Sequence, residues 1–209
     1  EVRRWTDASY LECQDFWRLS GITRDCYVYA RPMVHLYDFF AQSSLTNNYR
    51  DGSLQLQAQI WNNAAVPNGK YSLKASLTAP GGKTVFEQTQ NTPGLVFAGG
   101  KTELQFRAVL PQVMAWSAET PHLYTLQLTL LDENKKTVEV VSRKIGFRTD
   151  EVVNGRYLHN GKPIYLYGVN RHETHPLTHQ VVSYESMLRD VQEMKRLNIN
   201  AVRTSHYPN

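Results

Sequence analysis

Two segments near the end of the chain each combine an arginine with a histidine. Arg171 directly precedes His172, and Arg203 lies three positions before His206. A guanidinium can hold a carboxylate through paired N–H donors, and a neutral imidazole can donate a hydrogen bond to a hydroxyl. Asn170, beside the first pair, is a further polar candidate. These residue types indicate a pocket for a ligand rich in hydroxyl groups and flanked by acidic catalysts.

Predicted strands lead into both pairs. The nearly continuous apolar run over 164–169 is typical of a buried parallel strand, and residues 199–203 predict a second strand. Active-site residues of a βα barrel lie at the carboxyl ends of its strands, so we expect the two pairs to share one pocket. A single β-α-β unit cannot bury its own strands, and we therefore expect the barrel to continue beyond Asn209.

The segment between these strands has the features of a helix. Ser183 can cap its start, and acidic residues come early while basic residues come late, the order that complements the helix dipole. Apolar residues recur at helical spacing and predict core packing: Met187, Leu188, Val191, Met194 and Leu197.

Most of the chain before this region predicts β structure. Apolar and polar residues alternate in about seven short segments over 32–148, and no helical period interrupts them. This pattern is typical of an antiparallel immunoglobulin-like β-sandwich. Between two of its strands, the segment 116–124 predicts a loop whose Trp116 and Tyr124 are held in the core.

The pattern changes after residue 148. Asn154-Gly155 and Asn160-Gly161 are turn signals that predict a small hairpin at the start of a third segment, 149–209. Residues 1–31 show no clean period and suit the end of an earlier domain. The overall fold class is therefore mainly β, with the truncated start of a TIM (β/α)8 barrel.

Bulk composition is that of an ordinary globular protein, with 41% hydrophobic and 20% charged residues in 209. The net charge of +4 comes from basic residues interleaved with acidic ones, which argues against nucleic-acid binding. No apolar run approaches the roughly 20 residues that span a bilayer, and no membrane association is expected. The 209 residues carry no targeting signal and do not decide between the cytoplasm and the periplasm as the compartment.

Metal chemistry is weakly supported by the residues alone. The segment 172–175 resembles a zinc motif, but its histidines are three apart rather than four, follow a strand and precede Pro176. His159, His175 and His179 suit surface or hydrogen-bonded loop positions. The only two cysteines, Cys13 and Cys26, cannot form a zinc site alone, and their spacing does not decide whether they pair.

Four segments together resemble one enzyme family. Residues 168–173 (Gly-Val-Asn-Arg-His-Glu) and 203–209 (Arg-Thr-Ser-His-Tyr-Pro-Asn) are similar to the start of the catalytic barrel in the glycoside hydrolase family that holds β-galactosidase and β-glucuronidase. Residues 5–22 resemble the end of its sugar-binding jelly-roll domain, and 116–124 resemble its immunoglobulin-like domain. The form of these segments is most similar to the large bacterial β-galactosidases.

The resemblance implies roles for individual residues. Asp15 matches a carboxylate that helps bind the galactosyl 6-hydroxyl and a sodium ion, while His172 and His206 match histidines that contact the galactosyl group. Arg203 matches an arginine near the nucleophile. Arg171 and Asn170 are implied pocket neighbours with less defined duties.

Retaining hydrolysis needs two carboxyl groups about 5 Å apart. The resemblance implies that both are glutamates on later barrel strands, beyond Asn209, together with the ligands of a magnesium ion; Glu173 does not match either catalyst. It implies a fragment, inactive in isolation, of a homo-oligomeric exo-β-galactosidase acting on β-galactosides. Two alternatives stay open: a β-glucuronidase or β-mannosidase of the same family, and a non-catalytic β-sandwich module that binds carbohydrate or protein.

Overall fold

A computed structural model describes residue 3 and residues 5–11, 17–19, 21–64, 69–93 and 98–206. It contains two compact units, Ala30–Ile164 and a second that combines Glu1–Tyr29 with Tyr165–Asn209. The chain is mainly β, as the sequence predicts, and the described residues contain one helix longer than a single turn.

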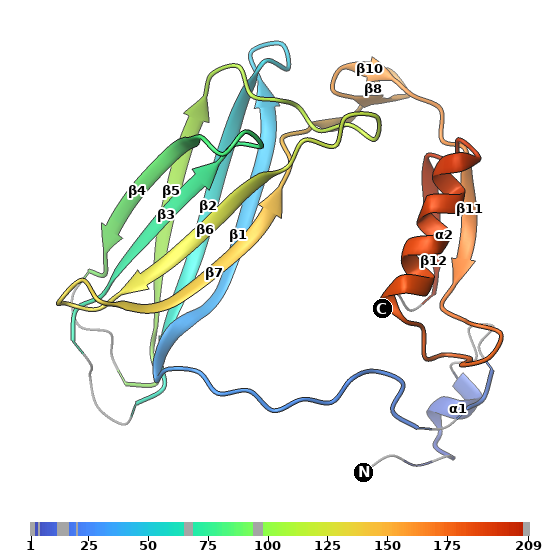
Figure 1. The fold of residues 1–209 in the computed structure, drawn as a ribbon, viewed down its shortest axis with the longest axis horizontal. Coiled ribbons are helices and arrows are strands. Elements are labelled where there is room, and N and C mark those ends of the chain that lie inside the picture. The colour runs from blue at the N-terminus through green and yellow to red at the C-terminus, as the bar shows by residue number, and fades with distance from the viewer. Residues whose placement is uncertain are drawn as a thin grey trace. The chain divides into compact units, whose positions relative to one another are not determined.

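The first unit is a β-sandwich of two antiparallel sheets that lie face to face (Figure 1). One sheet has the order β1-β2-β5, with β1 Val34–Thr46, β2 Asp51–Asn62 and β5 Lys101–Leu110. The other has the order β4-β3-β6-β7, with β4 Thr84–Asn91, β3 Ser72–Thr78, β6 Tyr124–Leu131 and β7 Thr137–Ile145. The seven strands confirm the predicted immunoglobulin-like architecture.

Alternating side chains build the core between the two sheets. In β2, Leu54, Leu56 and Ile60 are at most 1% exposed, whereas the glutamines between them face outward. Leu56 pairs with Phe106 of β5, which is fully buried on the same face. Burying a leucine or phenylalanine side chain contributes about 1.5–3 kcal/mol, so this inward face supplies the main driving force for the sandwich.

The loop between β5 and β6 is anchored to the core through Tyr124. The Tyr124 ring is 3% exposed and packs edge-on against Phe147, with ring centroids 5.1 Å apart. Its hydroxyl accepts a hydrogen bond from the Met114 backbone amide at 2.9 Å. Trp116 is only partly buried, and the Arg148 guanidinium lies over its ring. The predicted core position therefore fits Tyr124 better than Trp116.

A small sheet follows the sandwich and belongs to the same compact unit. It has the order β10-β9-β8, with β8 Asp150–Val153, β9 Arg156–His159 and β10 Lys162–Pro163. Asn154 and Gly155 have φ values of 49° and 74°. Positive φ at both central residues is the signature of a two-residue hairpin turn, so the predicted hairpin is confirmed.

The second unit contains a parallel β-α-β motif: β11 Gly168–His172, α2 Tyr184–Arg196 and β12 Ala201–Ser205. A short helix, α1 Ala8–Leu11, precedes it in the chain. Ser183 caps α2 by accepting a hydrogen bond from the Ser186 amide, as predicted. No helix in the described ranges is long and apolar enough to cross a membrane.

Two predictions for this unit were wrong in detail. The strand predicted over 164–169 begins only at Gly168, and the side chains of Tyr165 and Tyr167 are exposed. The register explains the late start, because Gly168 pairs with Ala201, where β12 begins. Before that point the Asn200 amide takes the place of a strand, accepting from the Tyr167 N–H and donating to the Tyr165 carbonyl, both at 2.8 Å.

The apolar stripe of α2 is also less covered than predicted. The described helix contains no buried residue, and Leu188, Val191 and Leu197 are 41%, 56% and 64% exposed. Two strands are too narrow to cover a helix stripe about 100° wide. The described residues include one parallel β-α-β motif and no closed barrel.

Candidate functional site

The parallel register of β11 and β12 brings the two arginine–histidine segments together. Asn170 pairs with Arg203, and His172 pairs with Ser205. Successive side chains in a strand point to opposite faces. Because the Arg171 side chain binds Asp190 of α2, Asn170 and His172 lie on the face of the sheet away from the helix.

Three of the predicted site residues contact one another on this face. The rings of His172 and His206 pack edge to face, with centroids 5.7 Å apart and planes at 89°. Arg203 Nη2 donates to His206 Nδ1 at 3.4 Å, and Arg203 Nη1 donates to the hydroxyl of Ser205 at 2.9 Å. We refer to Asn170, His172, Arg203 and His206 as the strand-end cluster.

Arg171 lies on the helix side of the sheet and is held by two carboxylates. Its Nη1 is 2.6 Å from Glu173 Oε1, and its Nε is 2.9 Å from Asp190 Oδ2. Burial disfavours the charged guanidinium, but the hydrogen bonds to Glu173 and Asp190 outweigh it and raise the pKa of Arg171. Arg171 therefore stays charged and ties β11 to α2, instead of lying beside the histidine rings.

Glu173 is a buried ion-pair partner of Arg171 that the sequence did not reveal. Its side chain is 5% exposed, and within the described part of the chain its Oε2 has no hydrogen-bond partner, nor does Nη2 of Arg171. One sequence signal indicated that Arg171 is paired with a carboxylate of the helix. Asp190 lies on the same helix face as Met187 and Met194, and a carboxylate inside an apolar stripe indicates a cationic partner on the facing strand.

Trp17 and Arg24 contact the segment 175–180 within the second unit. Trp17 packs edge-on against His179, with ring centroids 5.0 Å apart. Gln180 donates to the Trp17 carbonyl at 3.0 Å, and its own carbonyl accepts from Arg24 at 3.2 Å. His175 Nδ1 accepts from amides of its own loop, which matches a structural role for this histidine.

Asp15 lies outside the described residues, so the predicted sodium ligand has no geometry here. Across the ranges that the structure does describe, no group of three or more His, Cys, Asp or Glu side chains could hold a metal ion. Cys26 is a free, exposed thiol, and Cys13 lies outside the described residues.

The strand-end cluster offers hydrogen-bond donors rather than an acid and a nucleophile. Imidazole, guanidinium and amide groups can bind sugar hydroxyls or stabilise developing charge. Within the described residues, the carboxylates on the neighbouring helix side, Glu173 and Asp190, are both engaged by Arg171. The arrangement can therefore orient a polyhydroxylated ligand for groups supplied elsewhere.

Comparison with protein families matches two consecutive parts of the chain, and the boundary between them falls within the unit Ala30–Ile164. Residues 34–148 match the model described as "Glycosyl hydrolases family 2". Residues 151–209 match "Glycosyl hydrolases family 2, TIM barrel domain".

Individual relatives give the same picture. The chain is 45% identical to a β-galactosidase of Priestia megaterium and 41% identical to one of Pseudoalteromonas haloplanktis, in both cases over 100% of this chain and 20% of the relative. A crystal structure of Parabacteroides merdae β-glucuronidase has a TM-score of 0.74 and 27% identity, covering 85% of this chain and 21% of that one. The chain thus spans about a fifth of the length of the curated relatives it matches.

Proposed function

Because the chain belongs to glycosyl hydrolases family 2, we propose that it is part of a retaining exo-β-galactosidase that releases terminal β-D-galactosyl residues from β-galactosides. The observation that carries the substrate is the identity of 41–45% with β-galactosidases along the entire chain. The chain covers a fifth of those relatives, so the activity is proposed for the longer parent protein.

In this proposal the strand-end cluster forms one side of the galactosyl subsite. His172 and His206 donate hydrogen bonds to sugar hydroxyls, and the contact between their rings fixes the orientation of both donors. Arg203 is held through Ser205 and places its positive charge at the rim. Fixed donors to the sugar hydroxyls favour the distorted ring of the oxocarbenium-like transition state, because hydrogen bonds to hydroxyls can strengthen as the ring reaches that shape.

The remaining machinery is assigned to other residues of the parent. Asp15 binds the 6-hydroxyl and sodium, while the two catalytic glutamates and the magnesium ligands lie outside residues 1–209. Bound sodium supplies a positive charge for oxygen ligands, and magnesium supplies charge near the acid/base group. We propose that the parent is a homo-oligomer and that the 209-residue chain alone does not hydrolyse glycosides.

Parallel assays test whether the catalytic groups lie outside the 209-residue chain. The full-length parent and the 209-residue chain are compared on a chromogenic β-galactoside at equal molar concentration. We expect turnover by the parent and none above buffer for the chain alone. Turnover by the isolated chain would show that its own residues supply both catalysts, and the proposal would then be wrong.

β-Glucuronidase activity is the second candidate, favoured by the solved Parabacteroides merdae enzyme at 27% identity. Assaying the parent on matched galactoside and glucuronide substrates separates the two, since the aglycone is the same. Preference for the glucuronide would reject the galactosidase assignment. It would also remove the role of Asp15 as a 6-hydroxyl ligand, because two carboxylates would repel each other there.

A further inference from the structure

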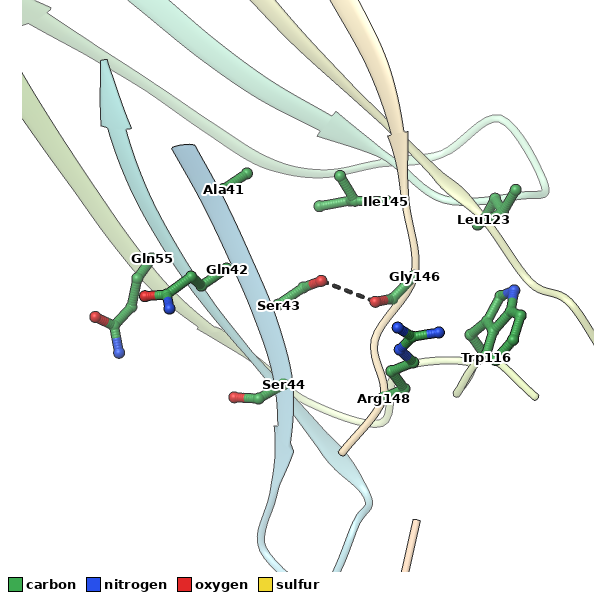
Figure 2. Close-up of a pocket in the computed structure, with 10 residues that line it drawn as sticks. All are labelled: Ala41, Gln42, Ser43, Ser44, Gln55, Trp116, Leu123, Ile145, Gly146 and Arg148. Carbon is green, nitrogen blue, oxygen red and sulfur yellow. Dashed lines mark hydrogen bonds between the residues drawn. The ribbon is translucent and has the colours of Figure 1, made fainter. Parts of the chain in front are cut away.

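The sandwich unit carries a cleft that the proposed hydrolysis does not use. It has a volume of about 720 Å³ and lies between β1 and the end of β7 (Figure 2). Gln42, Ser44 and Gln55 contribute polar groups, and Trp116, Leu123 and Arg148 line it as well. Pockets of roughly 300–1,000 Å³ are the usual size for small ligands, so the cleft has room for a disaccharide.

Two contacts hold the Arg148 side chain in the cleft and leave its two Nη groups unpaired within the described residues. Its guanidinium carbon lies 5.0 Å from the centroid of the Trp116 ring, and its Nε is 3.2 Å from Asp150 Oδ2. Neither Nη1 nor Nη2 has a hydrogen-bond or ion-pair partner in the described part of the chain, and the side chain is 52% exposed. A guanidinium held in this way presents two donor groups to a ligand oxygen pair at little entropic cost.

The carboxylate of Asp150, beside Arg148, does not line the cleft. Asp150 is not among the lining residues, and its Oδ1 already accepts from Tyr157 and His159 at 2.9 and 2.7 Å. The described lining contains no acidic side chain. Arg148 is therefore the only charged group that the described wall of the cleft presents.

Amide and hydroxyl groups occupy the wall on β1 and β2. Gln42 and Gln55 are cross-strand partners with side chains side by side, and neither side chain has a hydrogen-bond partner among the described residues (Figure 2). Ser43 donates to the Gly146 carbonyl at 2.8 Å, which holds β1 against the end of β7. Amides and hydroxyls both donate and accept, as the hydroxyls of a sugar do.

We propose that this cleft binds a saccharide that carries a carboxylate. The carboxylate lies on the Nη groups of Arg148, and sugar hydroxyls bind Gln42, Gln55 and Ser44. Leu123, which is 40% exposed, covers an apolar C–H face of the sugar. The site belongs to the sandwich unit and does not depend on the proposed hydrolysis, so either proposal can fail without the other.

Nuclear magnetic resonance titration of the labelled 209-residue chain tests the site. The probes are digalacturonic acid and galactobiose, which differ in the carboxylates. We expect the acid to shift the side-chain amides of Gln42 and Gln55 and the indole N–H of Trp116, without shifts at His172. Because a charge-assisted hydrogen bond is about twice as strong as a neutral one, the acid should bind roughly tenfold more tightly than galactobiose or better.

Substitutions identify the group that selects the acid. Arg148→Gln should abolish the roughly tenfold preference, while Arg143→Gln, the same change on an exposed β7 residue outside the cleft, should leave it intact. If Arg148→Gln lowers folding, Arg148→Lys replaces it; this change keeps the charge, removes the paired donors and should reduce the preference. Gln55→Leu should weaken both sugars equally. Absence of shifts in the cleft, a preference that survives Arg148→Gln, or tighter binding of an acidic peptide such as tri-aspartate would each overturn the proposal.

Discussion

Glu173→Gln is the sharpest test of how β11 is held against α2. The substitution removes the negative charge but keeps the side-chain size, so it leaves Arg171 with Asp190 as its only carboxylate among the described residues. Both Arg171 and Glu173 are largely buried, at 11% and 5% side-chain exposure. The cost should therefore exceed that of a surface pair.

Removing one partner of a buried ion pair costs about 3–5 kcal/mol when the remaining charge has no other partner. Arg171 retains Asp190 at 2.9 Å, and Asp190 is 45% exposed, so solvent also helps to screen the guanidinium. We therefore expect a smaller loss of about 2 kcal/mol, the range of one hydrogen bond to a charged group. In local opening, 2 kcal/mol corresponds to roughly a 30-fold change.

Native-state hydrogen exchange measures this loss where it occurs. Amides of β11 and α2 should exchange roughly 30-fold faster in Glu173→Gln, while the sandwich strands remain unchanged. Glu193→Gln is the matched control, because its pair with Arg196 is exposed at both ends and is worth at most about 0.5 kcal/mol. Equal exchange rates in the two variants would refute the claim that burial makes the Glu173 pair important.

Two further predictions concern the sandwich unit. Gly52→Ala should lower the free energy of unfolding by about 1–3 kcal/mol, because the added Cβ would meet the Phe147 ring at 2.8 Å. Gly81→Ala is the control, since a Cβ there would have no atom within 4 Å, and it should be nearly neutral. Urea unfolding measures both variants. Burial disfavours the Asp150 carboxylate, but hydrogen bonds from His159 and Tyr157 outweigh it and lower its pKa. The stabilisation from the Asp150 carboxylate should be fully present above the unfolded carboxyl pKa of about 3.9 and should be lost as the pH falls through the lower folded-state pKa. Asp150→Asn should flatten that part of the curve of unfolding free energy against pH. An unchanged curve would contradict this assignment.

The sandwich was predictable because its strands are half-buried. Alternation in β2 exposes one face and buries Leu54, Leu56 and Ile60, so the local pattern records the tertiary position of each side chain. Asn154 and Gly155 marked the hairpin for a different, local reason, because Asn and Gly readily adopt the positive φ that a two-residue turn requires.

The barrel segment was less predictable because its contacts are non-local. The apolar run over 164–169 suggested a strand, but pairing begins at Gly168, opposite Ala201. The side of the sheet that Arg171 faces depends on Asp190, and sequence position alone does not give it. The cleft beside Arg148 likewise forms from strands more than 100 positions apart, which no local period reports.

The strand-end cluster as part of a galactosyl subsite is the central claim, and kcat/KM of the full-length parent on a chromogenic β-galactoside tests it most directly. His172→Ala and His206→Ala should each lower kcat/KM by roughly 10²-fold or more, the effect of losing one preorganised transition-state donor. His122→Ala, a partly buried histidine of the sandwich unit, is the control and should leave kcat/KM close to wild type. Variants of His172 and His206 that fold normally and match the His122→Ala control would contradict the account.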